Sequence, residues 1–294
     1  MTQPEIYLCA LASNLCFAAA SIYFTKYTKK YSSIWMNQVK STVAFFAFCA
    51  AWASTESFFP ISVNAWASFI FSGFMGLCVA DIYMFRSYAT LGPARSLVLF
   101  SFQPFILASY GYFILGQTIS KVQLISILML FSCFGLLVME RSKLHGKWDI
   151  KSFVWAFFGV VFDAVGIIFT RNAFEHAPGV GPFQANATRI VGALLGFLII
   201  NPRSYKKMAR DFRVMLPLDR VSVIGASLIG TFLALALYLT SLKYAHLASL
   251  SCVNITAPVV LAAAESIRER KWPSVYLVCG LILFAAAILV LSFY

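Results

Sequence analysis

The chain has 294 residues, of which 61% are hydrophobic and only 12% are charged, and its mean hydropathy is +0.81. Soluble domains carry about a quarter charged residues, so the composition excludes a water-soluble, secreted, fibrous or disordered protein and predicts one with several membrane spans. The net charge of +12 falls in short tracts between apolar runs, which indicates membrane topology rather than nucleic-acid binding. All seven cysteines lie inside apolar segments, where we expect small buried side chains in the reduced state.

A helix needs about 20 apolar residues to cross the hydrocarbon core of a bilayer. The first apolar run lacks a basic leader and a cleavage site, so we interpret it as a membrane helix rather than a signal peptide. Two longer polar connections, residues 140–151 and 201–220, are too short for a soluble domain. The sequence predicts ten spans, at residues 5–24, 34–53, 63–89, 94–115, 122–139, 152–170, 181–200, 221–242, 247–267 and 274–293.

The second half of the chain repeats landmarks of the first half. Three pairs recur at a spacing of 154 residues: Pro104 and Pro258, Gly76 and Gly230, and Ala94 and Ala248. Residues 37–40 match residues 186–189 at a spacing of 149, with Asn followed three positions later by a cation. Each half holds five spans, an odd number, so the second copy must lie inverted in the membrane. Inverted repeats are typical of transporters that expose a central site to alternate sides.

The ten spans in a 5+5 arrangement, the prolines inside spans four and nine, and the cations in spans two and seven resemble the EamA family of the drug/metabolite transporter superfamily. Where that family often has Leu-Gly-Glu after span four, this chain has Leu115-Gly116-Gln117, and Glu269 lies near the corresponding place in the second half. The resemblance implies an all-α integral membrane protein, with ten transmembrane helices arranged as two inverted five-helix repeats around a central cavity. We expect the first repeat at residues 1–139, a cytoplasmic linker at 140–151 and the second repeat at 152–294.

Ionisable groups inside membrane spans are costly unless they face protein or water, so each is a candidate site residue. The resemblance implies a basic residue near the start of the second helix of each half, which here gives Lys40 and Arg189, with Asn37 and Asn186 one helical turn earlier. Such cations can meet a carboxylate or phosphate of the substrate. The alternative for Lys40 is that its side chain extends to the interface.

Two acids lie deep in spans. Asp81 and Arg86 are five residues apart on one helix and cannot form a same-face pair, so at least one needs a partner on another helix. Asp81 is a candidate for the cavity, and Asp163, between two glycines, is a candidate with Asp81 for proton coupling. The alternative for Asp163 is a structural hydrogen bond to backbone or to Arg189.

Prolines within a helix free backbone carbonyls one turn earlier, and such carbonyls are tolerated where they line a cavity. We therefore expect helix kinks at Pro104 and Pro258, with a kink used only for packing as the alternative. Ser101 and Gln103 lie near the first proline and Asn254 lies near the second, while Tyr83 and Tyr238 can bracket an organic substrate. These five residues complete the predicted substrate-binding set.

The leading function is a secondary carrier of small organic metabolites, amino-acid-like or other charged or zwitterionic solutes, by alternating access and with possible proton coupling. Its alternatives are a translocator of lipids or lipid-linked sugars and, less favoured, an integral membrane enzyme. The three histidines form no metal-binding spacing, and no phosphate-binding loop is present, so we expect no catalytic residue, no metal and no cofactor. The expected partners are the solute and membrane lipids, not nucleic acid, with a monomer favoured over a homodimer.

Charge in the loops predicts the orientation. Cytoplasmic loops carry an excess of Lys and Arg. The even-numbered loops hold Lys121, Arg171 and Lys243, whereas the odd-numbered loops hold nearly all other loop cations, in groups around residues 26–30, 141–151, 203–220 and 268–271. The sequence therefore predicts a bacterial inner-membrane protein with both termini outside.

Overall fold

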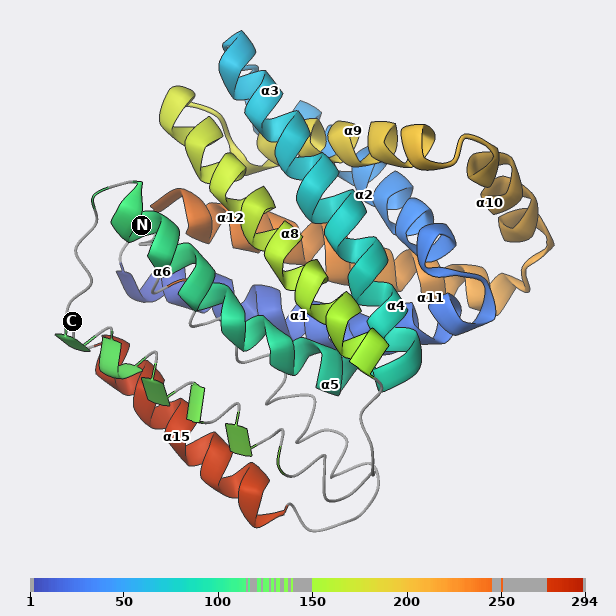
Figure 1. The fold of residues 1–294 in the computed structure, drawn as a ribbon. Coiled ribbons are helices and arrows are strands. Elements are labelled where there is room, and N and C mark those ends of the chain that lie inside the picture. The colour runs from blue at the N-terminus through green and yellow to red at the C-terminus, as the bar shows by residue number, and fades with distance from the viewer. Residues whose placement is uncertain are drawn as a thin grey trace.

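The computed structural model describes residues 3–114, 116, 121–122, 124–126, 128–129, 131–132, 135–136, 139, 150–244, 250 and 274–292. Within them every regular element is a helix (Figure 1). In chain order these are α1 (Gln3–Lys30), α2 (Ser33–Thr55), α3 (Val63–Ser72), η1 (Gly73–Ala80), α4 (Asp81–Leu91), α5 (Pro93–Val98), η2 (Leu99–Phe102), α6 (Gln103–Phe113), α8 (Ile150–His176), α9 (Pro182–Ile200), α10 (Arg203–Val214), α11 (Pro217–Ser227), η3 (Leu228–Leu233), α12 (Ala234–Tyr244) and α15 (Val275–Ser292).

Five helices among the described residues are long and apolar enough to cross a membrane: Glu5–Lys30, Val63–Leu91, Lys151–His176, Pro182–Ile200 and Pro217–Tyr244. They coincide with the predicted spans one, three, six, seven and eight. The predicted second span is α2, a helix of 23 residues, which at 1.5 Å per residue is also long enough to span about 30 Å. The predicted ninth span, apart from Leu250, lies outside the described residues.

One expectation from the sequence needs correction. Residues 94–115 do not form one continuous helix, because the chain turns into the 3₁₀ helix η2 immediately before α6, whose first turn contains Pro104. Proline cannot donate a backbone hydrogen bond, so it is tolerated at a helix start and not in the interior. The polar connection 201–220 contains the amphipathic helix α10, which lies at one end of the helix bundle (Figure 1).

Local signals in the sequence set the helix boundaries. The Ser32 and Ser62 hydroxyls accept the backbone N–H groups of Trp35 and Ala65 and so cap α2 and α3. Gly92 ends α4 at φ +85°, a conformation that glycine adopts without steric cost, and Pro93 begins α5. These boundaries follow from residues adjacent in the chain.

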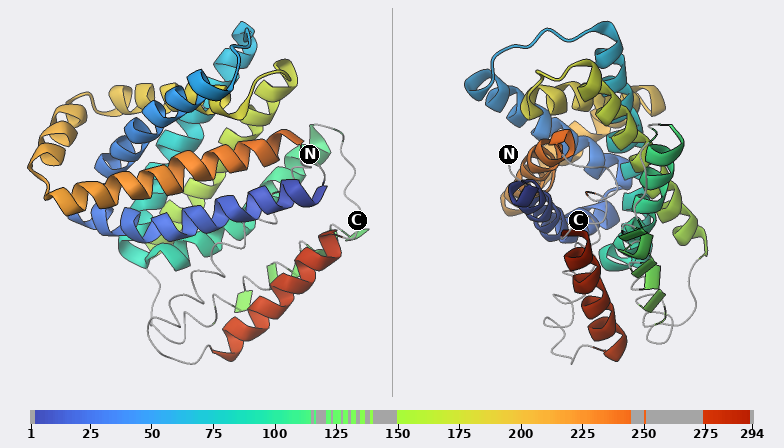
Figure 2. Two further views of the ribbon diagram at one scale, coloured as in Figure 1. Left: turned by 180° about the vertical axis from the view of Figure 1, so that it is seen from behind. Right: turned by 90° about the vertical axis from the view of Figure 1, so that its left-hand side faces the viewer.

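The first helix of the first repeat packs antiparallel to the third span of the second repeat. Along this contact the Tyr27 hydroxyl donates to Asp219, the Ser13 hydroxyl donates to the carbonyl of Ala234, and the Ser241 hydroxyl donates to the carbonyl of Ile6, all at 2.7–2.8 Å. As the residue number rises on α1 it falls on α11–η3–α12, and the two run side by side over their length (Figure 2). The helices of the two repeats are therefore interleaved.

The reciprocal contact joins the first helix of the second repeat to the third span of the first repeat. The Ser68 hydroxyl donates to Asn172, the Ser72 hydroxyl donates to the carbonyl of Gly166, and the ring of Tyr83 stacks on Phe162. This contact between α8 and α3–η1–α4 is also antiparallel. In each case the first helix of one repeat packs against the third span of the other repeat, as expected for two related halves.

The repeats are inverted. The end of α1 lies beside Asp219 at the start of α11, through Lys26 and Lys30. The end of α8 lies at the other extremity of that span, where the Arg171 guanidinium donates to the carbonyl of Leu242. The corresponding first helices of the two halves therefore end at opposite ends of the bundle.

Both third spans contain a π-helical segment at equivalent positions. The segments η1 and η3 include Gly76 and Gly230, the residues paired by the sequence repeat. The wider π turn disrupts the regular i to i+4 ladder and leaves carbonyls that need other donors. The side-chain amide of Asn37 donates to the carbonyls of Leu77 and Cys78, and that of Asn186 donates to the carbonyl of Leu235. Asn37 therefore bonds to the π segment η1 itself, and the equivalent Asn186 bonds to the first turn of α12, just after η3.

Glycines allow α9 and α8 to approach the third span of the first repeat closely. A Cβ on Gly192 would lie 1.9 Å from the carbonyl oxygen of Ile70, and one on Gly73 would lie 1.6 Å from that of Arg189. A Cβ on Gly166 would lie 2.9 Å from the Cα of Gly76. These contacts are between backbones, and no larger residue fits at these positions without moving a helix.

Candidate substrate site

A cavity of about 110 Å³ lies between the two repeats. It is large enough for several waters or a small organic solute. The first repeat and the second repeat both contribute to its wall, which is formed by Ser13, Asn14, Phe17, Lys40, Leu77, Asp81, Leu97, Asp163, Gly230, Thr231, Ala234, Leu235 and Tyr238. The mixture of apolar side chains with a few ionisable groups is typical of a binding site for a small molecule.

Lys40 and Asp81 form an ion pair in this wall. The Lys40 ammonium, on α2, donates to Asp81 at the start of α4, and the two side chains are 3% and 14% exposed. The ammonium also lies 4.9 Å from the ring centre of Phe85, a cation–π contact. Lys40 therefore points into the protein rather than to the interface, and Asp81 has the partner on another helix that its spacing from Arg86 requires.

Asp163, on α8, lies in a different environment from Asp81. Its Oδ2 accepts a hydrogen bond of 2.6 Å from the side-chain amide of the buried Gln103 on α6. Its Oδ1 faces Gly76, because a Cβ built on that glycine would lie 3.6 Å away. One carboxylate oxygen of Asp163 therefore accepts from a neutral amide, and the other faces the close-packed Gly76.

Arg189 is buried beside the cavity and does not line it. Its Nε donates to the Ser72 hydroxyl at 3.0 Å and its Nη1 approaches Oδ1 of Asn186 at 3.4 Å. Its Nη2 would lie 3.8 Å from the same Gly76 Cβ that Asp163 approaches. Arg189 and Asp163 therefore face each other across Gly76, and Arg189 connects the second span of one repeat to the third span of the other.

The structure divides the remaining predicted site residues. Tyr238 lines the cavity, and Asn37 and Asn186 lie next to it, where each donates to the backbone of a cavity-lining residue, Leu77 and Leu235. Tyr83 does not line it, since its ring packs against Phe158 and Phe162 on the outer side of α8. The side chains of Ser101 and Pro104, and the residues Asn254 and Pro258, lie outside the described part of the structure.

Three polar residues of the wall were not predicted from the sequence: Ser13, Asn14 and Thr231. Thr231 is 3% exposed, and its hydroxyl has no hydrogen-bond partner among the described residues, so it is available to a bound molecule or water. Neutral polar residues are frequent in membrane helices, which hides them when only charges are searched. The usable signal was the adjacent Ser-Asn pair within an otherwise apolar first span.

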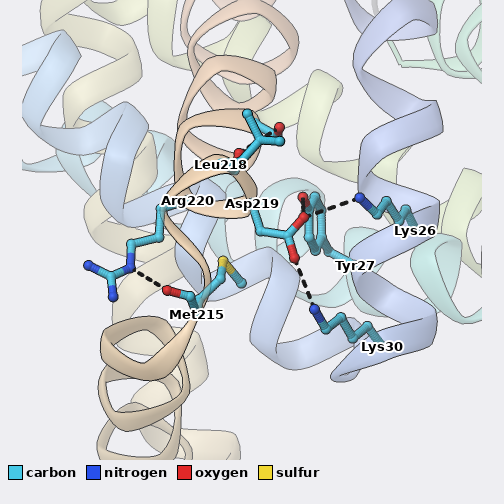
Figure 3. A network of polar contacts seen from close by, with 8 residues as sticks. Lys26, Tyr27, Lys30, Met215, Leu218, Asp219 and Arg220 are labelled. Atoms are coloured by element: carbon cyan, nitrogen blue, oxygen red, sulfur yellow. Dashed lines mark hydrogen bonds and ion pairs between the residues drawn. The ribbon is translucent and has the colours of Figure 1, made fainter.

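One end of the bundle carries an ionic cluster, formed by Asp219, Lys26, Tyr27 and Lys30 and hereafter called the Asp219 cluster (Figure 3). Oδ1 of Asp219 accepts from the Tyr27 hydroxyl at 2.8 Å and from Lys26 at 3.2 Å, and Oδ2 accepts from Lys30 at 2.9 Å. The cluster joins α1 of the first repeat to α11 of the second.

A hydrophobic core fills the space between the cavity and the Asp219 cluster. It includes Leu97, with Phe17 packed against it, and both of these line the cavity. It extends to Tyr27, which donates to Asp219, and contains the buried rings of Phe24 and Phe85. Apolar packing and, beyond it, charged contacts therefore lie between the cavity and this end of the bundle.

The opposite end of the bundle is held by different contacts. The carboxylate of Glu56 accepts the backbone N–H groups of Phe183 and Gln184, both at 3.0 Å, at the start of α9. The Lys243 ammonium donates to the carbonyl of Val180 at 2.9 Å. The segment between α2 and α3, the segment between α8 and α9, and the end of α12 therefore lie together at this end.

Comparisons with known proteins agree with this architecture. The EamA-like transporter family matches the chain twice, at residues 5–139 and 150–293. The chain belongs to the EamA-like transporter family. The family consists of membrane transporters, and its two matches fit the inverted repeat. No curated protein matches the chain.

Solved structures with the same fold are known. One, described only as "Crystal structure of protein", is 14% identical in sequence and superposes with a TM-score of 0.74, covering 99% of this chain and 98% of that chain. At this identity the likeness concerns the fold alone. It supports the interleaved arrangement of helices rather than any particular substrate.

Proposed function

We propose that this EamA-family protein is a secondary transporter of small organic metabolites, amino-acid-like or other charged or zwitterionic solutes, and that it works by alternating access. The observation that carries the proposal is the cavity between the inverted repeats, whose wall holds Lys40, Asp81 and Asp163. Oppositely charged groups in one small site suit a solute that itself carries both charges.

Alternating access requires the two repeats to move relative to each other while the site stays between them. The reciprocal pairing of α1 with α11–η3–α12 and of α8 with α3–η1–α4 gives two equivalent interfaces for such movement. Opening at the end of the Asp219 cluster requires α1 to separate from α11, which breaks the contacts of Asp219 with Lys26, Tyr27 and Lys30. The described arrangement is then the state closed at this end.

Proton coupling at Asp163 and Asp81 is part of the proposal. Both carboxyls line the cavity within membrane helices, so a proton taken up there moves with the conformational cycle. Asp163 has a neutral amide as its hydrogen-bond partner, whereas Asp81 has a cation. We therefore assign the exchanging proton first to Asp163.

We further propose that the protein lies in a bacterial inner membrane with both termini outside. The Asp219 cluster supports this, because it brings the cation-rich end of α1 and the start of α11 to one end, as the odd-numbered loops require. The domain limits 1–139, 140–151 and 152–294 complete the proposed organisation. A protease-sensitive tag after Tyr294 tests the orientation, and cleavage only after lysis would contradict it.

The function is tested with purified protein in proteoliposomes and a panel of labelled metabolites, with and without a pH gradient. We expect saturable uptake that the gradient stimulates. Asp163→Asn should lose gradient-driven accumulation but keep exchange of labelled for unlabelled solute, since exchange needs no net proton movement. Glu175→Gln, at an exposed carboxylate, is the matched control. Gradient-driven uptake that survives in both Asp163→Asn and Asp81→Asn would refute proton exchange at these sites.

A further inference from the structure

Helix α10 lies across one end of the bundle, at an angle to the spans on either side of it (Figures 1 and 2). Such a position places a helix along the membrane surface rather than through it. Its inner side is occupied by protein, because Met208 and Phe212 pack against the hydrophobic core around Tyr27, and Tyr205 packs against the core around Phe48. The apolar side of α10 is therefore not available for insertion into lipid.

Hydrogen bonds fix α10 to both repeats. The Tyr205 hydroxyl donates to the carbonyl of Leu194 at 2.8 Å, and the Gln38 side chain of α2 donates to the Ser204 hydroxyl at 2.6 Å. Burial raises the pKa of Tyr205 to about 12, so its phenol stays protonated and keeps donating. At the other end the Arg220 guanidinium donates to the carbonyl of Met215 (Figure 3) and also to that of Arg213.

The outer side of α10 is strongly basic. It exposes five cations: Arg203, Lys206, Lys207, Arg210 and Arg213. The only acid in the helix, Asp211, is mostly covered and lies 3.5 Å from Arg210. The face therefore carries a net positive charge, held in a fixed arrangement by the contacts of the inner side.

Large apolar side chains are exposed directly after these cations. Val214, Leu216 and Leu218 are 77%, 68% and 79% exposed, between the end of α10 and the first turn of the α11 span. Cations beside exposed apolar side chains, at the level where a span begins, match a charged headgroup above an acyl chain. An acidic soluble protein or a nucleic acid would use the cations but leave the apolar side chains in water.

We propose that the outer face of α10 binds the headgroups of anionic phospholipids, with Val214, Leu216 and Leu218 contacting their acyl chains. Binding here stabilises the described arrangement of helices, because α10 is joined to α2 and α9 and, through the segment that Arg220 caps, to α11. This role goes beyond solute transport and does not depend on the substrate.

The test measures thermal unfolding of the detergent-purified chain with added phosphatidylglycerol or phosphatidylcholine. We expect phosphatidylglycerol, and not phosphatidylcholine, to raise the Tm, and the increase to disappear in about 1 M salt, where the Debye length is about 3 Å. The variant Lys206→Gln/Lys207→Gln/Arg210→Gln should lose most of the increase. The control Lys29→Gln/Arg86→Gln/Lys121→Gln, which removes three exposed cations elsewhere, should keep it.

Equal responses of the two triple variants would overturn the proposal. So would an equal response of the unaltered chain to phosphatidylcholine, or full stabilisation by inorganic phosphate, which lacks acyl chains. If the α10 triple variant does not fold, the single variants Lys206→Gln and Lys207→Gln decide. Each should lower the Tm increase from phosphatidylglycerol more than Lys29→Gln does, and the proposal fails if neither does.

Discussion

Replacing Lys40 by Met removes the cation of the buried ion pair in the cavity wall. The side chain has similar length and keeps its packing against Phe24 and Phe85, but Asp81 loses its partner. The stability of this variant therefore distinguishes a buried ion pair from a lysine that is exposed at the membrane interface.

The two roles differ in magnitude. Two unit charges 4 Å apart attract by about 4 kcal/mol at an effective dielectric constant near 20. Removing one partner of a buried pair costs about 3–5 kcal/mol, because the other charge stays buried. An exposed ion pair contributes about 1 kcal/mol or less. With exposures of 3% and 14%, Lys40 and Asp81 belong to the first case.

Thermal unfolding of the purified chain measures the difference. At about 2–4 °C per kcal/mol, Lys40→Met should lower the Tm by on the order of 10 °C. The double variant Lys40→Met/Asp81→Asn should recover most of the loss, because no unpaired charge remains. Lys29→Met, at an exposed lysine, is the control. A Tm for Lys40→Met equal to that of the control, or a double variant as unstable as the sum of the single variants, would refute the buried pair.

Two further predictions concern the site and the helix contacts. Arg189→Ala, which removes the buried guanidinium that donates to Ser72, should reduce solute uptake at least about tenfold, or about 1.4 kcal/mol. The control Arg86→Ala, at an exposed cation near Tyr83 and Trp155, should take up solute about as fast as the unaltered chain. Equal uptake by both variants in proteoliposomes would exclude a role of Arg189 in transport. Gly192→Ala should lower the free energy of unfolding by about 1–3 kcal/mol, because the new Cβ meets the Ile70 carbonyl. The control Gly225→Ala, whose Cβ meets nothing within 4 Å, should stabilise α11 by up to about 1 kcal/mol. A Tm for Gly192→Ala at or above that of the unaltered chain would contradict the close backbone contact.

The membrane class, the positions of five long apolar spans, the inverted repeat and the family were all predictable from the sequence. Hydropathy is a property of consecutive residues, and the bilayer imposes one length on every span, so the apolar stretches mark helices without knowledge of their neighbours. The repeat was visible because Gly76 and Gly230, and Asn37 and Asn186, occupy equivalent positions. The π segment around each of these glycines, and the bonds of the asparagines to the backbone of each third span, appeared only in three dimensions.

The partners of the buried polar groups were decided by the tertiary structure alone. Lys40 pairs with Asp81, Gln103 donates to Asp163, and Arg189 reaches Ser72 in the other repeat. No rule of spacing selects these partners, because they lie on different helices at separations of 41 to 117 residues. In a bilayer nearly every helix face is apolar, so hydrophobicity does not specify which faces meet. That choice depends on backbone approach at glycines and on satisfying each buried polar group, both of which require the packed neighbours.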